Sequence, residues 1–321
     1  MIETQTWSAL RRYWHPVMLS TDLEVKPRPV QLLGESLVLC RLGTRPCCFS
    51  DLCVHRGTPL SLGWVDQDRL ICAYHGWNFD CNGQCVRIPA IPADRPIPSR
   101  AKVSSYPCVE RYGLLWVCLD EDPVRGIPEC PEFGDSEFNH YLVGPFHWKC
   151  SAARSIENFV DQAHFPWVHE GILGNRDQPE AIPVEVERLP EELRYSFVDR
   201  PNPMHPVPHR RVYRISRPFT IHQQKQRDGG YDIEASFFTV TPNSAHESTN
   251  FLYVFRNFEL PGEEARSRIE LDRQIMLQDK VILESQRPEE LPLDLSAELH
   301  IKGPDAVAVA YRRMMAELGV N

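Results

Sequence analysis

The sequence lacks any run of apolar residues long enough to cross a membrane. A membrane-spanning helix needs about 20 consecutive apolar residues, and no stretch of the 321 residues approaches that length. The first residues, MIETQTWSALRRYWHPV, also lack the apolar centre of a secretory signal peptide. We therefore expect a cytoplasmic protein that has no membrane partner.

The sequence has no excess of basic residues and no motif for binding a dinucleotide. Lys and Arg total 35 against 44 Asp and Glu, which gives a net charge of -9, and no basic stripe alternates with aromatic residues. A nucleic-acid partner is therefore not expected. The G-x-G-x-x-G turn that cradles a pyrophosphate is also missing. The chain is not expected to bind a nicotinamide or flavin dinucleotide by itself.

A hydrophobic fraction of 42% in 321 residues is enough to form two domains. Residues 28–120 contain short alternating or apolar runs separated by Gly, Pro and Asn, which is typical of antiparallel strands. From about residue 147 the pattern changes to a helical segment, long strands and two helices near 263–286 and 306–318. We expect an α+β chain with an all-β domain and an N-terminal helix in residues 1–146. A large antiparallel β-sheet flanked by helices is expected in residues 147–321.

Eleven cysteines in a reducing compartment predict thiols, a few of which ligate metal, and not a disulfide framework. Two of them lie beside histidines, in Cys53-Val-His55 and, sixteen residues later, in Cys72-Ala-Tyr-His75. A Rieske-type [2Fe-2S] cluster needs two cysteines on one iron and two histidines on the other. Tetrahedral zinc would accept the same four ligands. The other nine are expected to be structural thiols: Cys40, Cys47, Cys48, Cys81, Cys85, Cys108, Cys118, Cys130 and Cys150.

A second group of polar residues occupies the helical segment that begins the second domain. Asn158, Asp161 and His164 are three residues apart, so on a helix they share one face. His169 is five residues from His164, and we expect Pro166 to end the helix and let His169 fold back. Two such imidazoles suit the non-heme iron sites that are completed by one carboxylate. The alternative is a pair of core histidines satisfied by hydrogen bonds.

The carboxylate is expected farther along the chain, in the helix EARSRIELDRQIMLQDKVILESQR. Asp279 falls on a stripe of apolar residues that includes Met276 and Ile282. A carboxylate on an apolar face is costly unless it is paired or bound to metal. Asp305 is the main rival, but its position before a helical run explains it as an N-cap. Weaker candidates are Asp272 and Glu284.

Taken together, these segments resemble the α subunit of the Rieske non-heme iron oxygenases over nearly the full length of the chain. The sequence is most similar to the monooxygenase group that includes methylxanthine N-demethylases, dicamba O-demethylase and saxitoxin-pathway hydroxylases. The stretches that carry this resemblance are CVHRGTPLSLG, CAYHGWNFD, ERYGLLWVCLD (110–120), SIENFVDQAHFPWVHEG (155–171), LQDKVILESQRP (277–288) and VAYRRMMAELGV (309–320).

The resemblance implies a [2Fe-2S] Rieske cluster and a mononuclear Fe(II). It assigns one cluster iron to Cys53 and Cys72, the other to His55 and His75, and the catalytic iron to His164, His169 and Asp279. Asn158 matches a residue close to that iron. Asp161 matches the acidic residue that, in the family, connects a cluster histidine of one subunit, here His75, to an iron histidine of its neighbour, here His164. A homotrimer follows from that connection.

The implied activity is O2-dependent hydroxylation or oxidative N- or O-demethylation of a small aromatic, heterocyclic or methylated substrate. Electrons would come from a separate NAD(P)H-dependent reductase or ferredoxin. An arene cis-dihydroxylating dioxygenase is one alternative. A Rieske electron-transfer protein without oxygenase activity is another, although it needs only about the first 120 residues. Candidates for lining a substrate pocket, each of which simple core packing also explains, are Phe165, Phe237, Tyr253, Phe255 and Met276.

Overall fold

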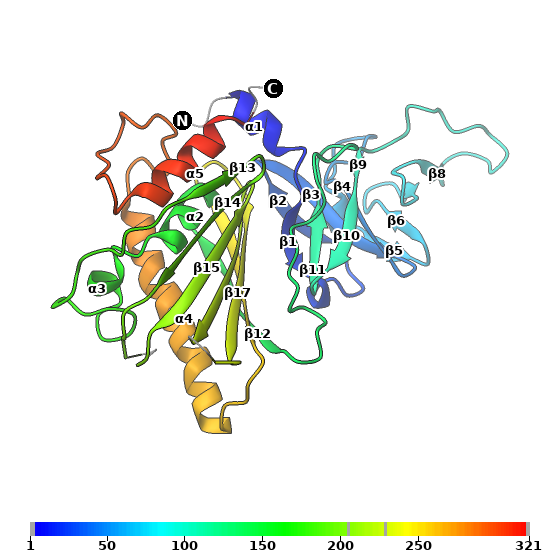
Figure 1. The fold of residues 1–321 in the computed structure, drawn as a ribbon. Helices are drawn as coiled ribbons and strands as arrows, with labels where there is room; N and C mark the ends of the chain where they lie inside the picture. Colours follow the sequence, from blue (N-terminus) through cyan, green and yellow to red (C-terminus); the bar gives the residue numbers. More distant parts are fainter. Residues whose placement is uncertain (1–3, 204–205, 228–229, 319–321) are drawn as a thin grey trace. The chain divides into compact units, whose positions relative to one another are not determined.

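The computed structural model describes residues 4–203, 206–227 and 230–318. The chain forms two compact units (Figure 1). One spans Leu10–Ile127, and the other contains the residues before and after it. The expected boundary at residue 146 falls within β12 (Asn139–Trp148), a strand of the second unit. In the described part of the chain, no helix is both long and apolar enough to cross a membrane.

The unit Leu10–Ile127 consists of three small antiparallel β-sheets, as the short alternating runs predict. The three-stranded sheet has the order β1 (His15–Leu19), β11 (Leu114–Val117), β10 (Cys108–Arg111). The second sheet has the order β2 (Arg28–Leu32), β3 (Glu35–Leu42), β4 (Arg45–Ser50), β9 (Ser105–Tyr106). The third has the order β5 (Trp64–Asp66), β6 (Arg69–Ile71), β7 (Asn78–Phe79), β8 (Cys85–Arg87). Two 3-10 turns, Ser20–Asp22 and Leu60–Leu62, complete this unit.

A disulfide in this unit corrects one expectation. Cys47 on β4 is bonded to Cys81, which follows β7, across a Cα–Cα distance of 5.7 Å. The prediction that both are free thiols is therefore wrong. The two residues meet because the second and third sheets share one apolar core, to which Phe49 and Phe79 contribute. Sequence spacing alone cannot reveal this proximity, because it depends on how two separate sheets pack.

The second unit is built on a seven-stranded antiparallel sheet, which confirms the expected α+β fold. Most of its strands are joined by hairpins, so neighbours in the sequence are also neighbours in the sheet. The strands lie in the order β12, β18 (Ser248–Arg256), β17 (Ile233–Pro242), β16 (Thr220–Arg227), β15 (His209–Ser216), β14 (Glu192–Val198), β13 (Glu187–Leu189).

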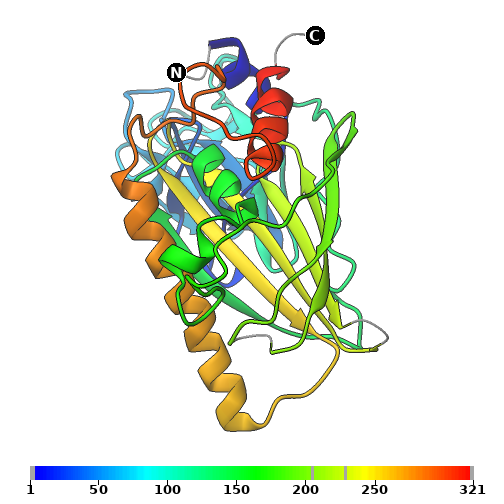
Figure 2. The same ribbon diagram turned by 60° about the vertical axis from the view of Figure 1, so that its left-hand side comes forward.

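Helices of the second unit lie along this sheet. The long α4 (Gly262–Ser285) packs beside β12, and α2 (Ala152–Val160) packs on β17 and β18 and contacts α4 and α5 (Figure 2). This arrangement brings two segments that are more than one hundred residues apart together over one face of the sheet. The remaining helices are α1 (Thr4–Leu10), α3 (Phe165–Val168) and α5 (Ala306–Ala316).

Candidate functional site

The two Cys/His segments of the first unit form turns with the same backbone hydrogen bonds. In the first turn, the Cys53 N–H donates to Thr58 O and the Gly57 N–H donates to Cys53 O, each over 2.9 Å. The second turn repeats the pattern, with Gly76 N–H donating to Cys72 O over 2.9 Å. Gly57 and Gly76 have φ of 70° and 65°, a left-handed conformation that favours glycine. The paired turns therefore present two equivalent sets of ligands.

The four side chains are divided into a buried half and an outer half. Cys53 and Cys72 are buried, whereas His55 is half-buried and His75 is exposed. The imidazole rings lie 4.5 Å apart between centroids, and Trp77 stacks on His55 at 4.6 Å. Burial, together with the neighbouring Cys72 thiol, raises the pKa of Cys53 to about 11. Two adjacent buried sulfurs and two adjacent outer imidazoles fit a Rieske cluster, which carries thiolates on one iron and imidazoles on the other.

In the second unit, the two histidines and the acid expected to hold a metal converge. His164 Nε2 and His169 Nε2 are 3.2 Å apart, and Asp279 Oδ1 lies 3.0 Å from His169 Nε2 and 3.5 Å from His164 Nε2. All three offer ligand atoms within 4.8 Å of one another. Two imidazoles and one carboxylate are the donor set of the non-heme Fe(II) oxygenases. The residues therefore fit one mononuclear iron.

The route by which these histidines meet differs from the expected one. Helix α2 ends at Val160, and Asp161 is already extended, with φ of -79° and ψ of 120°. Its Oδ1 accepts a hydrogen bond from Ala163 N–H over 2.7 Å, a local bond that competes with helix formation. The prediction of one helical face through His164 is therefore wrong. Pro166 does not end a helix but lies in the first turn of α3, where proline is tolerated.

His164 and His169 flank α3, and each ring is oriented by a polar side chain. Asp161 Oδ2 lies 3.1 Å from His164 Nδ1, and Gln278 Oε1 lies 2.8 Å from His169 Nδ1. Such contacts fix the ring and its tautomer, so that Nε2 of each histidine faces the other candidate ligand atoms. Asp279 lies next to Gln278 on α4. Sequence reasoning missed Gln278, for which the only signal was its position beside the candidate ligand.

The environment of the group is polar and enclosed. His169 is fully buried and Asp279 is 6% exposed. Burial lowers the pKa of His169, but the Asp279 carboxylate and Gln278 outweigh it, so the pKa is raised. Asn158 Nδ2 donates to Asp279 Oδ1 over 3.3 Å, which places Asn158 beside the ligand atoms as expected.

Two of the alternative carboxylates, Asp305 and Glu284, are engaged by backbone N–H groups, and neither belongs to the group of ligand atoms formed by His164, His169 and Asp279. Asp305 precedes α5, but its side chain does not cap that helix and instead accepts from Ile301 N–H. Glu284 accepts from Lys149 N–H over 2.9 Å. The apolar stripe that pointed to Asp279 is also narrower than expected, because Ile282 is 42% exposed.

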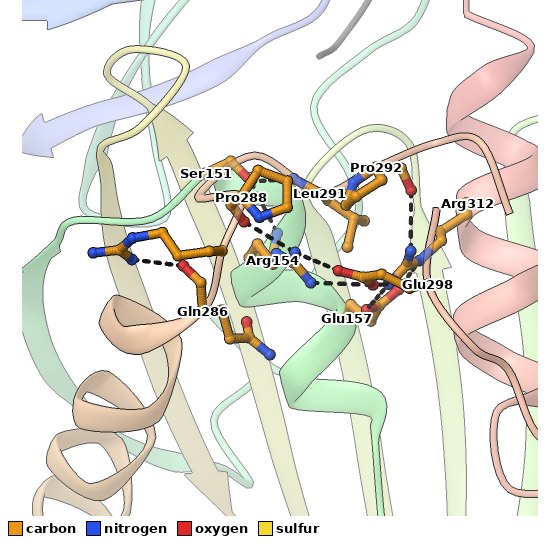
Figure 3. Close-up of polar contacts among 10 residues, drawn as sticks. Ser151, Arg154, Glu157, Gln286, Pro288, Leu291, Pro292, Glu298 and Arg312 are labelled. Atoms are coloured by element: carbon orange, nitrogen blue, oxygen red, sulfur yellow. Dashed lines mark hydrogen bonds and ion pairs between the residues drawn. The ribbon is translucent and has the colours of Figure 1, made fainter. Parts of the chain in front are cut away.

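A network of ion pairs holds α2 in place beside the site (Figure 3). Arg312 on α5 binds Glu157 of α2 through two bonds of 2.6 and 2.7 Å, and it binds Glu298 over 2.6 Å. Arg154, also on α2, binds Glu298 over 2.7 Å and Pro288 O over 3.0 Å. Both arginines are buried. The helix that carries Asn158 and leads into Asp161 is thus tied to α5 and to the segment after α4.

A chamber of about 80 Å³ opens in front of the two histidines and Asp279. Phe165 and Met276 line it, but Phe237, Tyr253 and Phe255 do not. Successive side chains of a strand point to opposite faces, and the chamber lies on the face of their neighbours. The volume is smaller than the roughly 150 Å³ of an enclosed cavity that accommodates benzene. A pocket of about 430 Å³ shares Lys225 and Glu234 with this wall.

Known protein families match both units. The Rieske [2Fe-2S] domain matches residues 13–107, and the vanillate O-demethylase oxygenase C-terminal domain matches residues 148–320. The second match covers more than half of the chain.

Individual relatives match over nearly the whole chain. Methylxanthine N1-demethylase NdmA of Pseudomonas putida is 34% identical over 321 residues, which cover 96% of this chain and 89% of the relative. Methylxanthine N3-demethylase NdmB of the same organism is 30% identical, and the match covers 100% of this chain and 92% of that relative. The solved structure of NdmA with caffeine has a TM-score of 0.89 at 32% identity and covers 99% of this chain and 93% of its own. The chain therefore belongs to the Rieske non-heme iron oxygenases, as an oxygenase α subunit of the monooxygenase type that carries a Rieske [2Fe-2S] cluster and a mononuclear iron.

Proposed function

We propose that Cys53, Cys72, His55 and His75 hold the Rieske cluster and that His164, His169 and Asp279 hold the mononuclear iron. The observation that carries the second assignment is the convergence of two Nε2 atoms and one carboxylate oxygen within 4.8 Å. The matched hydrogen bonds of the Cys53 and Cys72 turns support the first. When bound, the mononuclear iron supplies dioxygen activation with electrons received from the cluster.

Asp161 and Asn158 take supporting roles in this proposal. Asp161 accepts the Nδ1 proton of His164, which keeps the ring aimed at the metal, and its 34% exposed side chain remains accessible to a neighbouring subunit. We assign the second contact of Asp161 to His75 of another copy, in a homotrimer. Asn158 holds Asp279 Oδ1 in position through its amide.

The reaction that we propose is oxidative demethylation or hydroxylation of a small methylated aromatic or heterocyclic molecule. Substrate methyl, O2, two electrons and two protons would give the demethylated compound, formaldehyde and water, because the hydroxylated methyl carbon leaves as formaldehyde. NdmA and NdmB are both named as N-demethylases, and their similarity over nearly the whole chain supports this reaction. We also propose that the enzyme works in the cytoplasm, where a reductase delivers electrons from NAD(P)H.

Metal analysis and a substrate screen test the proposal. The protein should contain close to three irons per chain. With a surrogate reductase it should consume O2 and release formaldehyde or hydroxylated products, identified by mass, from a panel of N-methyl and O-methyl compounds. Two irons per chain and no substrate-dependent O2 uptake would instead identify an electron carrier.

A further inference from the structure

The seven-stranded sheet forms the floor of the chamber. Its strands contribute two different rows of side chains to that floor. Antiparallel pairing places Tyr213, Gln223, Ser236 and Val254 side by side on β15, β16, β17 and β18. All four side chains line the chamber. Because the side-chain period of a strand is two, the next row on the same face lies two residues along each strand. This second row consists of Arg211, Lys225, Glu234 and Arg256.

Each cation of the second row is engaged with a carboxylate, either Glu234 of the same row or Asp199 outside it. Arg211 Nε donates to Asp199 Oδ2 over 2.6 Å, and Lys225 Nζ donates to Glu234 Oε1 over 2.9 Å. Glu234 also accepts from Arg256 Nε over 2.9 Å. Burial lowers the pKa of Lys225, with Glu234 opposing the shift. The two cations that line the chamber, Arg211 and Lys225, are therefore engaged with carboxylates.

A further carboxylate lines the same chamber. Asp272 of α4 accepts from the Tyr141 hydroxyl over 2.5 Å, and Arg256 lies 3.8 Å from its carboxylate. Burial raises the pKa of Asp272. Among the described residues that line the chamber, an anionic substrate would therefore meet no disengaged cation, and it would lie near Glu234 and Asp272. Burying a charge without a partner costs several kcal/mol.

The first row is uncharged and retains hydrogen-bonding capacity. Gln223 donates through Nε2 to the Tyr213 hydroxyl. Its Oε1 atom and the Ser236 hydroxyl have no hydrogen-bond partner among the residues that the structure describes. A carboxamide carries an acceptor and a second N–H on one edge. That edge complements a molecule with a carbonyl and an N–H, or with a carbonyl alone.

We propose that the substrate is an electrically neutral molecule with an amide-like or lactam-like edge, which Gln223 and Ser236 recognise while its methyl group faces His164, His169 and Asp279. This inference rests on the proposed function and narrows its substrate class. It excludes aromatic carboxylates, which need a disengaged cation that this chamber does not provide.

Binding measurements on matched pairs of compounds test the proposal. In each pair a primary amide is exchanged for a carboxylate of the same shape, as in 4-methoxybenzamide and 4-methoxybenzoate, and the same exchange is made on two-ring N-methyl lactams. Calorimetry with the metal-loaded protein should show the neutral member of the best-binding pair bound at least tenfold more tightly. Carboxylates that bind as tightly as their amides, or a panel in which no neutral member binds, would overturn the proposal.

Variants at Gln223 separate recognition from folding. Gln223→Leu should weaken binding of the neutral compounds about tenfold to hundredfold, because substrate polar groups are left unpaired. Gln223→Lys introduces a cation and should move the preference toward the carboxylates. Gln226 is an exposed residue on the same strand, so Gln226→Leu is the matched control. It should change neither the affinity for the neutral compounds nor the preference between amides and carboxylates. If Gln223→Lys leaves the ratio of amide affinity to carboxylate affinity unchanged, Gln223 does not recognise the substrate.

The same panel distinguishes this proposal from the proposed function. Amides that bind through Gln223 but are neither demethylated nor hydroxylated by protein carrying both metal centres would overturn the reaction and leave the substrate class standing. Formaldehyde released preferentially from carboxylates would support the reaction and overturn the substrate class.

Discussion

Replacing Asp161 by Asn tests how the side chain beside His164 supports turnover. The carboxylate accepts two hydrogen bonds at once, from Ala163 N–H over 2.7 Å and at His164 Nδ1 over 3.1 Å. An amide of the same shape has only one acceptor atom. Whichever way the substituted amide is turned, it must therefore direct its NH2 group at one of these two N–H donors.

The size of the effect follows from that lost contact. A hydrogen bond to a charged group contributes about 1.5–3 kcal/mol, and each 1.36 kcal/mol corresponds to about a tenfold change. Losing the orientation of His164 should therefore slow turnover by about tenfold to hundredfold. If Asp161 also connects His164 to the cluster histidine of another subunit, the loss should exceed hundredfold.

The assay measures iron content, the visible spectrum of the cluster and the rate of product formation with excess reductase. We expect Asp161→Asn to retain both metal centres and to lose nearly all turnover. Asp294→Asn is the matched control, because Asp294 also accepts two local bonds, from Ser296 N–H and Oγ, but lies far along the chain in an exposed turn. The control should behave like the wild type.

Two results would contradict the reasoning. Full activity in Asp161→Asn would show that neither the orientation of His164 nor electron transfer depends on the carboxylate. Loss of the mononuclear iron in that variant would show that Asp161 contributes to metal binding and not to turnover alone.

Three further predictions concern other parts of the chain. Asp279→Ala should empty the mononuclear site and leave the visible absorption of the cluster intact; iron retained at that site would show that Asp279 is not a required ligand. Gln278→Leu should weaken iron binding about tenfold to hundredfold by releasing His169 Nδ1, whereas Gln278→Glu should preserve most of it, as measured by chelator competition. Burial lowers the pKa of His15 to about 4 from 6.5, so its contribution to stability is present above pH 6.5 and is lost as the pH falls toward 4. Between pH 7 and pH 5 the free energy of unfolding should fall by about 2 kcal/mol, and His15→Gln, which keeps a donor for Leu10 O, should remove that part of the decline in urea titrations.

The sequence by itself identified the candidate ligands of both metal centres. Cys and His in closely spaced pairs, with glycines at positions that require positive φ, specify local turns whose geometry depends on a few neighbouring residues. Asp279 was identifiable as a candidate ligand because a carboxylate on an apolar helical face is costly unless it is paired or bound to metal. The periodicity of the strands likewise predicted the antiparallel sheets.

Only the tertiary structure decided how distant segments meet. The path from Asp161 to His169 depends on a local hydrogen bond that ends α2, and helical spacing alone did not predict it. Gln278 acquires its role because α4 packs alongside α2, and Cys47 reaches Cys81 because two sheets share a core. The two rows of the chamber floor exist because pairing among β15, β16, β17 and β18 aligns residues from four strands, and the register of that pairing is set by which face of each strand is buried and by the turns that join the strands.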